Sequence, residues 1–210
     1  TQLLTVIVSS KIAIPSLVIM IGGIFVFCAF ALYAQGSLLF KETFDDQLDV
    51  FQSGKWAFSK VEKYRNQPVS VKPSATAPEG FILDHGIELT QDMKHYGFGS
   101  SFDKPISLGK DPNLVIQYEL KFEEPLNCGG AYIKLLRDAS DLSALDSSTP
   151  YSIMFGPDKC GATNKVHLIF QHQNPISKKW EEKHFNETVP VRGDSNTHLY
   201  TLVLRQNQDF

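Results

Sequence analysis

Residues 114–122, with the sequence LVIQYELKF, alternate apolar and polar side chains and decide the fold class of this chain. Side chains that alternate in this way point to opposite faces of an extended strand, so one face would pack on a core and the other would meet water. The apolar members that would share the core face are Ile116, Tyr118, Leu120 and Phe122. The stretch therefore predicts a half-buried β-strand.

Three further segments alternate in the same way or are rich in β-branched and aromatic residues, and they predict strands at residues 132–136, 166–172 and 199–205. Clusters of Gly, Pro, Asp, Asn and Ser, which are typical of turns, separate the predicted strands. These clusters lie at residues 110–113, 147–150, 156–158 and 192–194. Short strands with turns between them, and almost no helical period, predict an all-β antiparallel sandwich.

The composition limits both the number of domains and the class of function. A chain of 210 residues is long enough for one domain with a substantial core. Its 20 Lys and Arg residues nearly balance its 23 Asp and Glu residues, so it lacks the basic excess that is typical of nucleic-acid-binding proteins. An apolar content of 42% excludes an intrinsically disordered chain.

An apolar stretch near the N-terminus, residues 12–34, contains no charged residue. It is long enough to cross a bilayer, and with Lys11 before it the stretch also resembles a secretory signal. The small residues Ala34 and Gly36 fit a cleavage site. We therefore expect residues 1–36 to be a signal peptide or a retained signal anchor, helical in its apolar part and separate from the sandwich, and residues 37–210 to enter the secretory pathway.

The three cysteines agree with this compartment. Cys28 lies inside the apolar stretch, which leaves Cys128 and Cys160 for the folded domain. In an oxidising compartment such a pair forms a disulfide, whereas the alternative is two buried free thiols. Neither cysteine belongs to a CxxC motif or to a Cys/His spacing that is typical of zinc sites.

One acidic pattern raises the alternative of a β-sandwich glycoside hydrolase. Glu119 and Glu123 flank Lys121 with the spacing that some β-sandwich glucanases use for their acids. On a regular strand four residues span about 13 Å, whereas the carboxyls of a retaining pair are about 5.5 Å apart. We therefore expect a solvated strand face rather than a catalytic pair, and a protein that is not an enzyme.

A second pattern combines two side chains that would suit a carbohydrate. Tyr132 and Lys134 are two residues apart on a predicted strand and would share one face. An aromatic ring can pack on the C–H face of a sugar while an ammonium group donates hydrogen bonds to its hydroxyls. On the spacing alone, however, an ordinary exposed pair is the better interpretation.

Two longer motifs give these residues a context. Residues 121–136, KFEEPLNCGGAYIKLL, and residues 153–161, IMFGPDKCG, closely resemble the two signatures of the calnexin/calreticulin family. The resemblance covers roughly residues 38–210. The segment Glu181–His184 (EEKH), together with FGPDKCG, is similar to the calnexin branch rather than to calreticulin.

The resemblance implies a fold and a function. The fold would be a legume-lectin-like (concanavalin A-like) antiparallel jelly roll. The function would be that of a calcium-dependent lectin chaperone of the endoplasmic reticulum, which binds monoglucosylated high-mannose N-glycans on newly made glycoproteins and performs no covalent chemistry. A truncated sandwich without lectin activity is the further alternative, because the Pro-rich arm of the family and the segment after it have no counterpart in these residues. That arm would recruit thiol oxidoreductase and prolyl isomerase partners, and a membrane span follows it in calnexins.

The resemblance also assigns roles to individual residues. The residues that match the family's sugar pocket are Tyr132, Lys134, Tyr151, Met154 and Glu182, and those that match its flank are Asp158 and Ile169. Thr43 and Asp84 match calcium ligands, and their oxygen donors suit Ca²⁺. Cys128 and Cys160 match a family disulfide beside the sugar. On an unbroken strand Met154 would face away from Tyr151, so the implied pocket requires a bulge or strand end near Phe155.

The sequence also contains one candidate modification site. Asn186, Glu187 and Thr188 form an N-glycosylation sequon, which is a credible acceptor in a lumenal protein.

Overall fold

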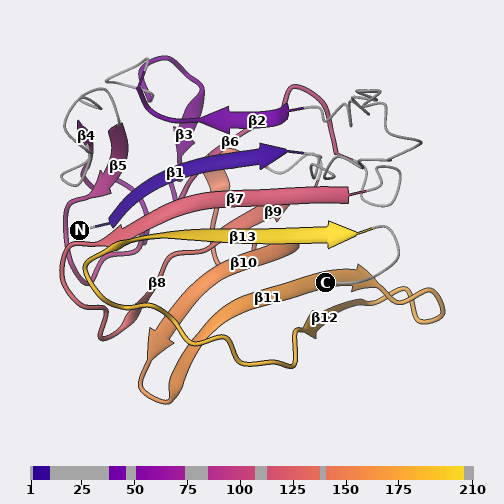
Figure 1. Ribbon diagram of the computed structural model, residues 1–210. Helices are drawn as coiled ribbons and strands as arrows, with labels where there is room; N and C mark the ends of the chain where they lie inside the picture. Colours follow the sequence, from indigo (N-terminus) through magenta and orange to yellow (C-terminus); the bar gives the residue numbers. More distant parts are fainter. Residues whose placement is uncertain are drawn as a thin grey trace, which may run out of the picture.

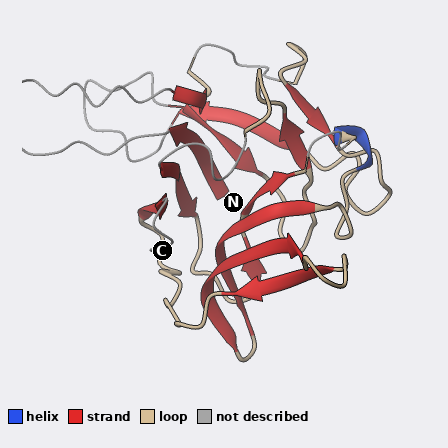
Figure 2. Cartoon of the chain, turned by 90° about the vertical axis from the view of Figure 1, so that its right-hand side faces the viewer, coloured by secondary structure: helices blue, strands red, loops and turns tan. Residues whose placement is uncertain are grey.

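The computed structural model describes residues 2–9, 38–45, 51–73, 85–106, 113–137 and 141–205. In these residues the chain folds into two antiparallel sheets that form a β-sandwich, with one short 3₁₀ helix, Leu142–Ala144 (Figures 1 and 2). The predicted all-β antiparallel sandwich is therefore confirmed.

The larger sheet has six strands in the order β13-β7-β1-β5-β4, and β2 pairs with β1. Its strands are β1 (Gln2–Ser9), β2 (Leu38–Glu42), β4 (Val69–Pro73), β5 (His85–Leu89), β7 (Asn113–Phe122) and β13 (Thr197–Arg205). β7 contains the alternating stretch at 114–122 and lies between β1 and β13. The strand that the sequence marks most clearly is thus an interior strand of this sheet.

The smaller sheet has five strands in the order β12-β11-β10-β8, and β9 pairs with β10. Its strands are β8 (Gly129–Gly130), β9 (Ile133–Leu136), β10 (Tyr151–Cys160), β11 (Thr163–Gln173) and β12 (Trp180–His184). β12 lies at the edge of this sheet (Figure 1). A separate two-stranded ribbon pairs β3 (Trp56–Phe58) with β6 (Phe98–Ser100).

The main core lies between the two sheets. Its buried residues include Ile116, Tyr118 and Leu120 of β7, Tyr200 and Leu202 of β13, and Leu135, Ile153, Phe155 and Leu168 of the smaller sheet. Tyr118 is 1% exposed, and its hydroxyl donates a hydrogen bond of 2.9 Å to the carbonyl oxygen of Ala131, which lies just before β9. The same side chain thus fills the core and satisfies a backbone acceptor at the opposite sheet.

Close approach of the two sheets requires glycine at position 156. Gly156 lies in β10 with a φ of 144°, and a Cβ there would overlap the Tyr118 hydroxyl and lie 2.7 Å from the Ala131 carbonyl oxygen. A backbone without a side chain is therefore needed opposite the buried tyrosine.

The two acids of the glucanase-like pattern, Glu119 and Glu123, are exposed as expected. Lys121 between them is only 7% exposed, and its ammonium lies 3.6 Å from a carboxylate oxygen of Glu123. Its strand has neighbours on both sides, with Leu3 and Thr197 as the paired residues, so little of the residue reaches water.

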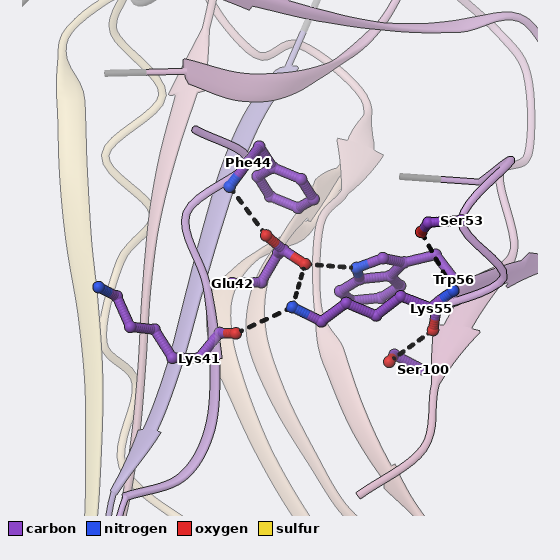
Figure 3. A network of polar contacts seen from close by, with 7 residues as sticks. All are labelled: Lys41, Glu42, Phe44, Ser53, Lys55, Trp56 and Ser100. Carbon is purple, nitrogen blue, oxygen red and sulfur yellow. Dashed lines mark hydrogen bonds and ion pairs between the residues drawn. The ribbon is translucent and has the colours of Figure 1, made fainter. Parts of the chain in front are cut away.

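A second apolar cluster contains Phe44, Trp56 and Ile87 and surrounds a buried carboxylate, Glu42. Glu42 accepts hydrogen bonds from the backbone N–H of Phe44 (2.9 Å) and the indole N–H of Trp56 (3.0 Å). It also forms a 2.7 Å ion pair with Lys55 (Figure 3). Burial raises the pKa of Glu42, but these three donors outweigh it and hold the pKa below its usual value of 4.5.

The N-terminal residues differ from the predicted domain organisation. The sequence predicts that residues 1–36 lie outside the sandwich, whereas Gln2–Ser9 forms β1 and pairs along its whole length with β7. The apolar stretch 12–34 and its cleavage site lie outside the described residues, so the signal peptide or anchor stays a prediction. In the part of the chain that the structure describes, no helix is long and apolar enough to cross a membrane.

Candidate functional site

The residues expected to bind sugar gather on the face of the smaller sheet that points away from the main core. Ile153 and Phe155 of β10 belong to the core, whereas Met154 between them packs with Tyr151 and Ile169 in a separate cluster. Lys134 of β9 is the paired residue of Met154, and Ile169 of β11 is its paired residue on the other side. Three adjacent strands thus contribute to one patch.

An irregularity in β10 brings Tyr151 and Met154 to the same face. Tyr151 pairs with Leu136 and Ile153 with Leu135, so two steps along β10 match one step along β9. The extra residue is Ser152, and it forms a β-bulge. The family resemblance requires a bulge or strand end near Phe155, but the bulge comes before Ile153, and β10 continues to Cys160.

Tyr151 and Glu182 form the polar centre of this face. The Tyr151 hydroxyl donates a 2.7 Å hydrogen bond to Oε1 of Glu182, which also accepts a 3.2 Å hydrogen bond from the side-chain amide of Gln171. The Lys134 ammonium lies 4.9 Å from the centre of the Tyr151 ring. A half-buried cation and an exposed carboxylate thus both contact the buried Tyr151, one at its ring and the other at its hydroxyl.

The hydrogen bond between Tyr151 and Glu182 shifts the pKa values of the two residues in opposite directions. Burial, and then the hydrogen bond to Glu182, raises the pKa of the Tyr151 phenol, while the same hydrogen bond is the main cause of a lowered pKa at Glu182. The phenol therefore donates to an ionised carboxylate at neutral pH. Burial lowers the pKa of Lys134, and the negative charges of Glu182 and Asp146 oppose this effect.

Tyr132 and Asp158 lie toward the other end of the patch. Tyr132 immediately precedes β9 and is 43% exposed. Asp158 pairs with Gly130, and burial followed by the charge of Asp158 raises the pKa of Tyr132. A carboxylate oxygen of Asp158 lies 3.2 Å from Nε2 of His167, which supports its position beside the tyrosine.

Three residues that were not predicted from the sequence, Gln171, Arg137 and Trp180, extend the site from Glu182 toward the start of β12. Gln171 links Glu182 to Arg137, whose guanidinium donates a 2.6 Å hydrogen bond to the Gln171 amide oxygen. The Arg137 guanidinium also lies over the Trp180 ring, 3.3 Å from its centre. Trp180 is two residues before Glu182 on one strand, so their spacing was a signal that they share a face. No local pattern marks Arg137.

The predicted disulfide is present. Cys128 is bonded to Cys160, which joins the start of β8 to the end of β10. In the same region Gly129 pairs with Lys159 and Gly130 with Asp158. The bridge therefore secures the short strand that leads into Tyr132.

The expected calcium ligands are only partly within the described residues. Thr43 follows β2, whereas Asp84 lies outside the described part of the chain. The Asp45 carboxylate accepts a 2.8 Å hydrogen bond from the backbone N–H of His85, so the segment after Thr43 lies beside the residue that follows Asp84. Among the described residues, no cluster of three or more His, Cys, Asp or Glu could hold a metal ion. The calcium ligands implied by the resemblance therefore stay a prediction.

The remaining candidates lie apart from this face. Glu119 and Glu123 belong to the larger sheet or its end and contribute nothing to the Tyr151–Glu182 group. Asn186 is exposed in the loop after β12, where an oligosaccharide could be attached.

Comparisons with known proteins agree with the motifs. A Calreticulin family profile matches residues 40–210. "Calnexin homolog 1" of Arabidopsis thaliana is 38% identical over 180 residues, which is 84% of this chain and 32% of that protein. "Calnexin homolog" of Aspergillus fumigatus is 44% identical over 137 residues, 64% of this chain and 24% of that protein. The chain thus spans about a third or less of the length of these relatives.

A solved structure shows the same fold. The chain named "T. cruzi calreticulin globular domain" superimposes with a TM-score of 0.59 at 34% sequence identity. The match covers 72% of this chain and 54% of that chain.

Proposed function

Because this chain belongs to the calreticulin family and is calnexin-like, we propose that it is part of a lectin chaperone of the endoplasmic reticulum. Its ligand would be the monoglucosylated high-mannose N-glycan of a newly made or unfolded glycoprotein. Calcium would support the fold, and the protein would hold its client without covalent chemistry. Thiol oxidoreductase and prolyl isomerase partners would bind a Pro-rich arm in the whole protein, and a membrane segment would anchor it.

The observation that carries this proposal is the group formed by Lys134, Tyr151 and Glu182. Its two charged members, Lys134 and Glu182, can make the polar contacts that a hexose offers. The ammonium donates to ring hydroxyls, the carboxylate accepts from them, and the buried Tyr151 hydroxyl holds the carboxylate in place, while the exposed ring of the nearby Tyr132 can cover C–H groups. The carboxylate already holds its neighbours through the Tyr151 and Gln171 hydrogen bonds, so little side-chain ordering is needed when a sugar binds.

The terminal glucose would occupy this group, with Tyr132 on one side and Met154 at the base. Met154 is 9% exposed and packs against Tyr151 and Ile169, which gives the patch an apolar base. Asp158, beside Tyr132, would flank the sugar as a further acceptor. The alternating donors, acceptors and apolar atoms suit a carbohydrate better than a purely apolar ligand.

The test is calorimetric titration of a glucose-capped trimannose into the full chain and single variants. Hydrogen bonds to charged groups contribute about 1.5–3 kcal/mol, and those between neutral groups about 0.5–1.5 kcal/mol. Lys134→Ala and Glu182→Ala should therefore weaken binding by roughly tenfold or more. Tyr132→Phe and Tyr151→Phe should have smaller effects.

Glu119→Gln is the matched control, because this exposed acid lies on a strand of the other sheet. It should leave the affinity unchanged. If Glu119→Gln abolished binding while Lys134→Ala did not, the proposed pocket would be wrong. Hydrolysis of the oligosaccharide would replace the lectin with a glycoside hydrolase.

A further inference from the structure

We propose that Asn186 carries an N-linked oligosaccharide, and that this oligosaccharide shields the edge of β11 from association with a second copy of the chain. The sequence contains one Asn-X-Ser/Thr sequon whose middle residue is not proline, and it comprises Asn186, Glu187 and Thr188. The modification is separate from the proposed function, because it concerns what is attached to this chain rather than what the chain binds.

The sequon lies in a loop that leaves the edge of the smaller sheet and returns to it. The backbone N–H of Phe185 donates a 2.9 Å hydrogen bond to the carbonyl oxygen of Leu168. Two residues earlier on β11, the N–H of Val166 donates a 2.7 Å hydrogen bond to the carbonyl oxygen of Val189. One residue of a paired strand would fit between these two anchors, but the loop has three, residues 186–188, and all three are exposed.

The acceptor amide is accessible for transfer of an oligosaccharide. Neither Asn186 nor Thr188 enters a side-chain hydrogen bond or ion pair with any described residue, and both lie outside regular secondary structure. The donor would be an oligosaccharide that is linked through pyrophosphate to a lipid carrier. The amide nitrogen of Asn186 forms a bond to C1 of the first sugar, the C1–O bond breaks with its electron pair on the pyrophosphate, and a base of the transferase takes the amide proton.

The disulfide agrees with the compartment in which this transfer occurs. Cys128 is bonded to Cys160, and such bridges form in oxidising compartments of the secretory pathway. An Asn-X-Thr sequon in a surface loop of a protein that enters this pathway is an acceptor site.

The same part of the sheet edge exposes apolar side chains. Among the described strands, β12 pairs with β11 at residues 169–173, so the loop lies beside the earlier part of β11. Phe185 and Val189, which anchor the loop on either side of the sequon, are 36% and 49% exposed. Strand edges with exposed apolar residues favour association between copies. A bulky, hydrophilic oligosaccharide on Asn186 would cover this edge.

Translocation of the full chain into vesicles of the endoplasmic reticulum tests the modification. Chains that are protected from external protease should show one shift in electrophoretic mobility, which peptide:N-glycosidase removes. Asn186→Gln and Thr188→Ala should lose the shift. Thr188→Ser is the matched control, which should keep it because serine retains the hydroxyl of the sequon.

Three outcomes would overturn the modification. They are a shift that persists in Asn186→Gln, a protected chain without a shift, and a chain that stays outside the vesicles, where Asn186 would never meet the lipid-linked donor. None of these results depends on sugar binding, so the proposed function is tested separately by the titration of the glucose-capped trimannose.

Sedimentation velocity of the purified chains tests the shielding. Thr188→Ser should stay monomeric as its concentration rises, whereas Thr188→Ala should associate. Serine and alanine differ here by one hydroxyl, so the difference reports the oligosaccharide. Adding Val189→Ser to Thr188→Ala should reduce the association, because it removes an exposed apolar side chain. Equal association of the glycosylated Thr188→Ser and the unglycosylated Thr188→Ala would contradict the shielding.

Discussion

Glu42 illustrates how a single charged residue can organise an apolar cluster. Its carboxylate has a donor from the backbone, one from an indole and one from a lysine, which together compensate for its burial. Its lowered pKa means that the folded state favours the ionised form. The contribution to stability is therefore fully present above the unfolded-state pKa of about 4.3 and is lost as the pH falls through the lower folded-state pKa.

We expect Glu42→Gln to lower the free energy of unfolding by about 2–3 kcal/mol at pH 7, because the hydrogen bonds lose their charged acceptor. The deficit relative to the unmodified chain should shrink as the pH falls below the unfolded-state pKa and through the lower folded-state pKa of Glu42, because below the latter both chains carry a neutral group. Urea denaturation between pH 7 and pH 3 measures this. Glu62→Gln is the control, since that exposed acid has only a 3.8 Å contact with Arg65. A deficit that does not change with pH would contradict an ionised Glu42.

At this scale the sequence predicts some of the candidate site and misses the rest for a clear reason. The spacing of Tyr132 and Lys134 indicates a shared face because it depends on one strand. The hydrogen bond between Tyr151 and Glu182 joins residues 31 positions apart and depends on the registers of three strands. Without the family resemblance no local pattern selects these partners, and Arg137 and Trp180 were missed because their contact also crosses strands.

Among the elements, the positions of the strands were predicted more reliably than the pairing between strands. The stretch at 114–122 is contained in β7, and the segments at 166–172 and 199–205 lie within β11 and β13. Alternation indicates which residues are extended, but it does not indicate which strands pair. The pairing of Gln2–Ser9 with β7 was therefore missed, since those residues precede an apolar stretch that resembles a leader.

The disulfide can be tested as a link between two elements. The denatured, oxidised chain should show one titratable thiol, from Cys28, because Cys128 and Cys160 are bonded. Reduction should lower the free energy of unfolding by roughly 2–4 kcal/mol, as expected for a bridge between cysteines 32 positions apart. Thiol counting and chemical denaturation with and without reductant measure these effects. Three reactive thiols before reduction would show that the bridge does not form in the protein.

For the whole molecule, the proposed calcium site would connect two distant segments of chain. Thr43 follows β2, and Asp84 immediately precedes β5; the contact between Asp45 and His85 holds these segments together. A ligand that binds only the folded state stabilises it in proportion to its concentration above Kd. Calcium bound here would therefore act on the fold as a whole rather than on the sugar pocket alone.

We expect calcium to change the melting temperature of this chain little, because Ca²⁺ takes six to eight oxygen ligands and only Thr43 and Asp84 match calcium ligands of the family. Differential scanning calorimetry with calcium, magnesium or chelator measures the shift. A calcium-specific rise of several degrees that Asp84→Asn removes, and that Asp103→Asn at an exposed acid retains, would instead show that this chain assembles the site unaided.

The bulge at Ser152 has a consequence for how such a binding face can arise or disappear. In an uninterrupted strand, odd- and even-numbered residues are committed to opposite sides, so Tyr151 would share the core side with Ile153 and Phe155. The extra residue, Ser152, exchanges the two sides of the sheet for the residues of β10 that precede it. Point substitutions can change the chemistry of a side chain, but only gain or loss of a residue moves it through the sheet. Insertions and deletions of single codons are therefore the genetic events that determine which side of β10 presents Tyr151.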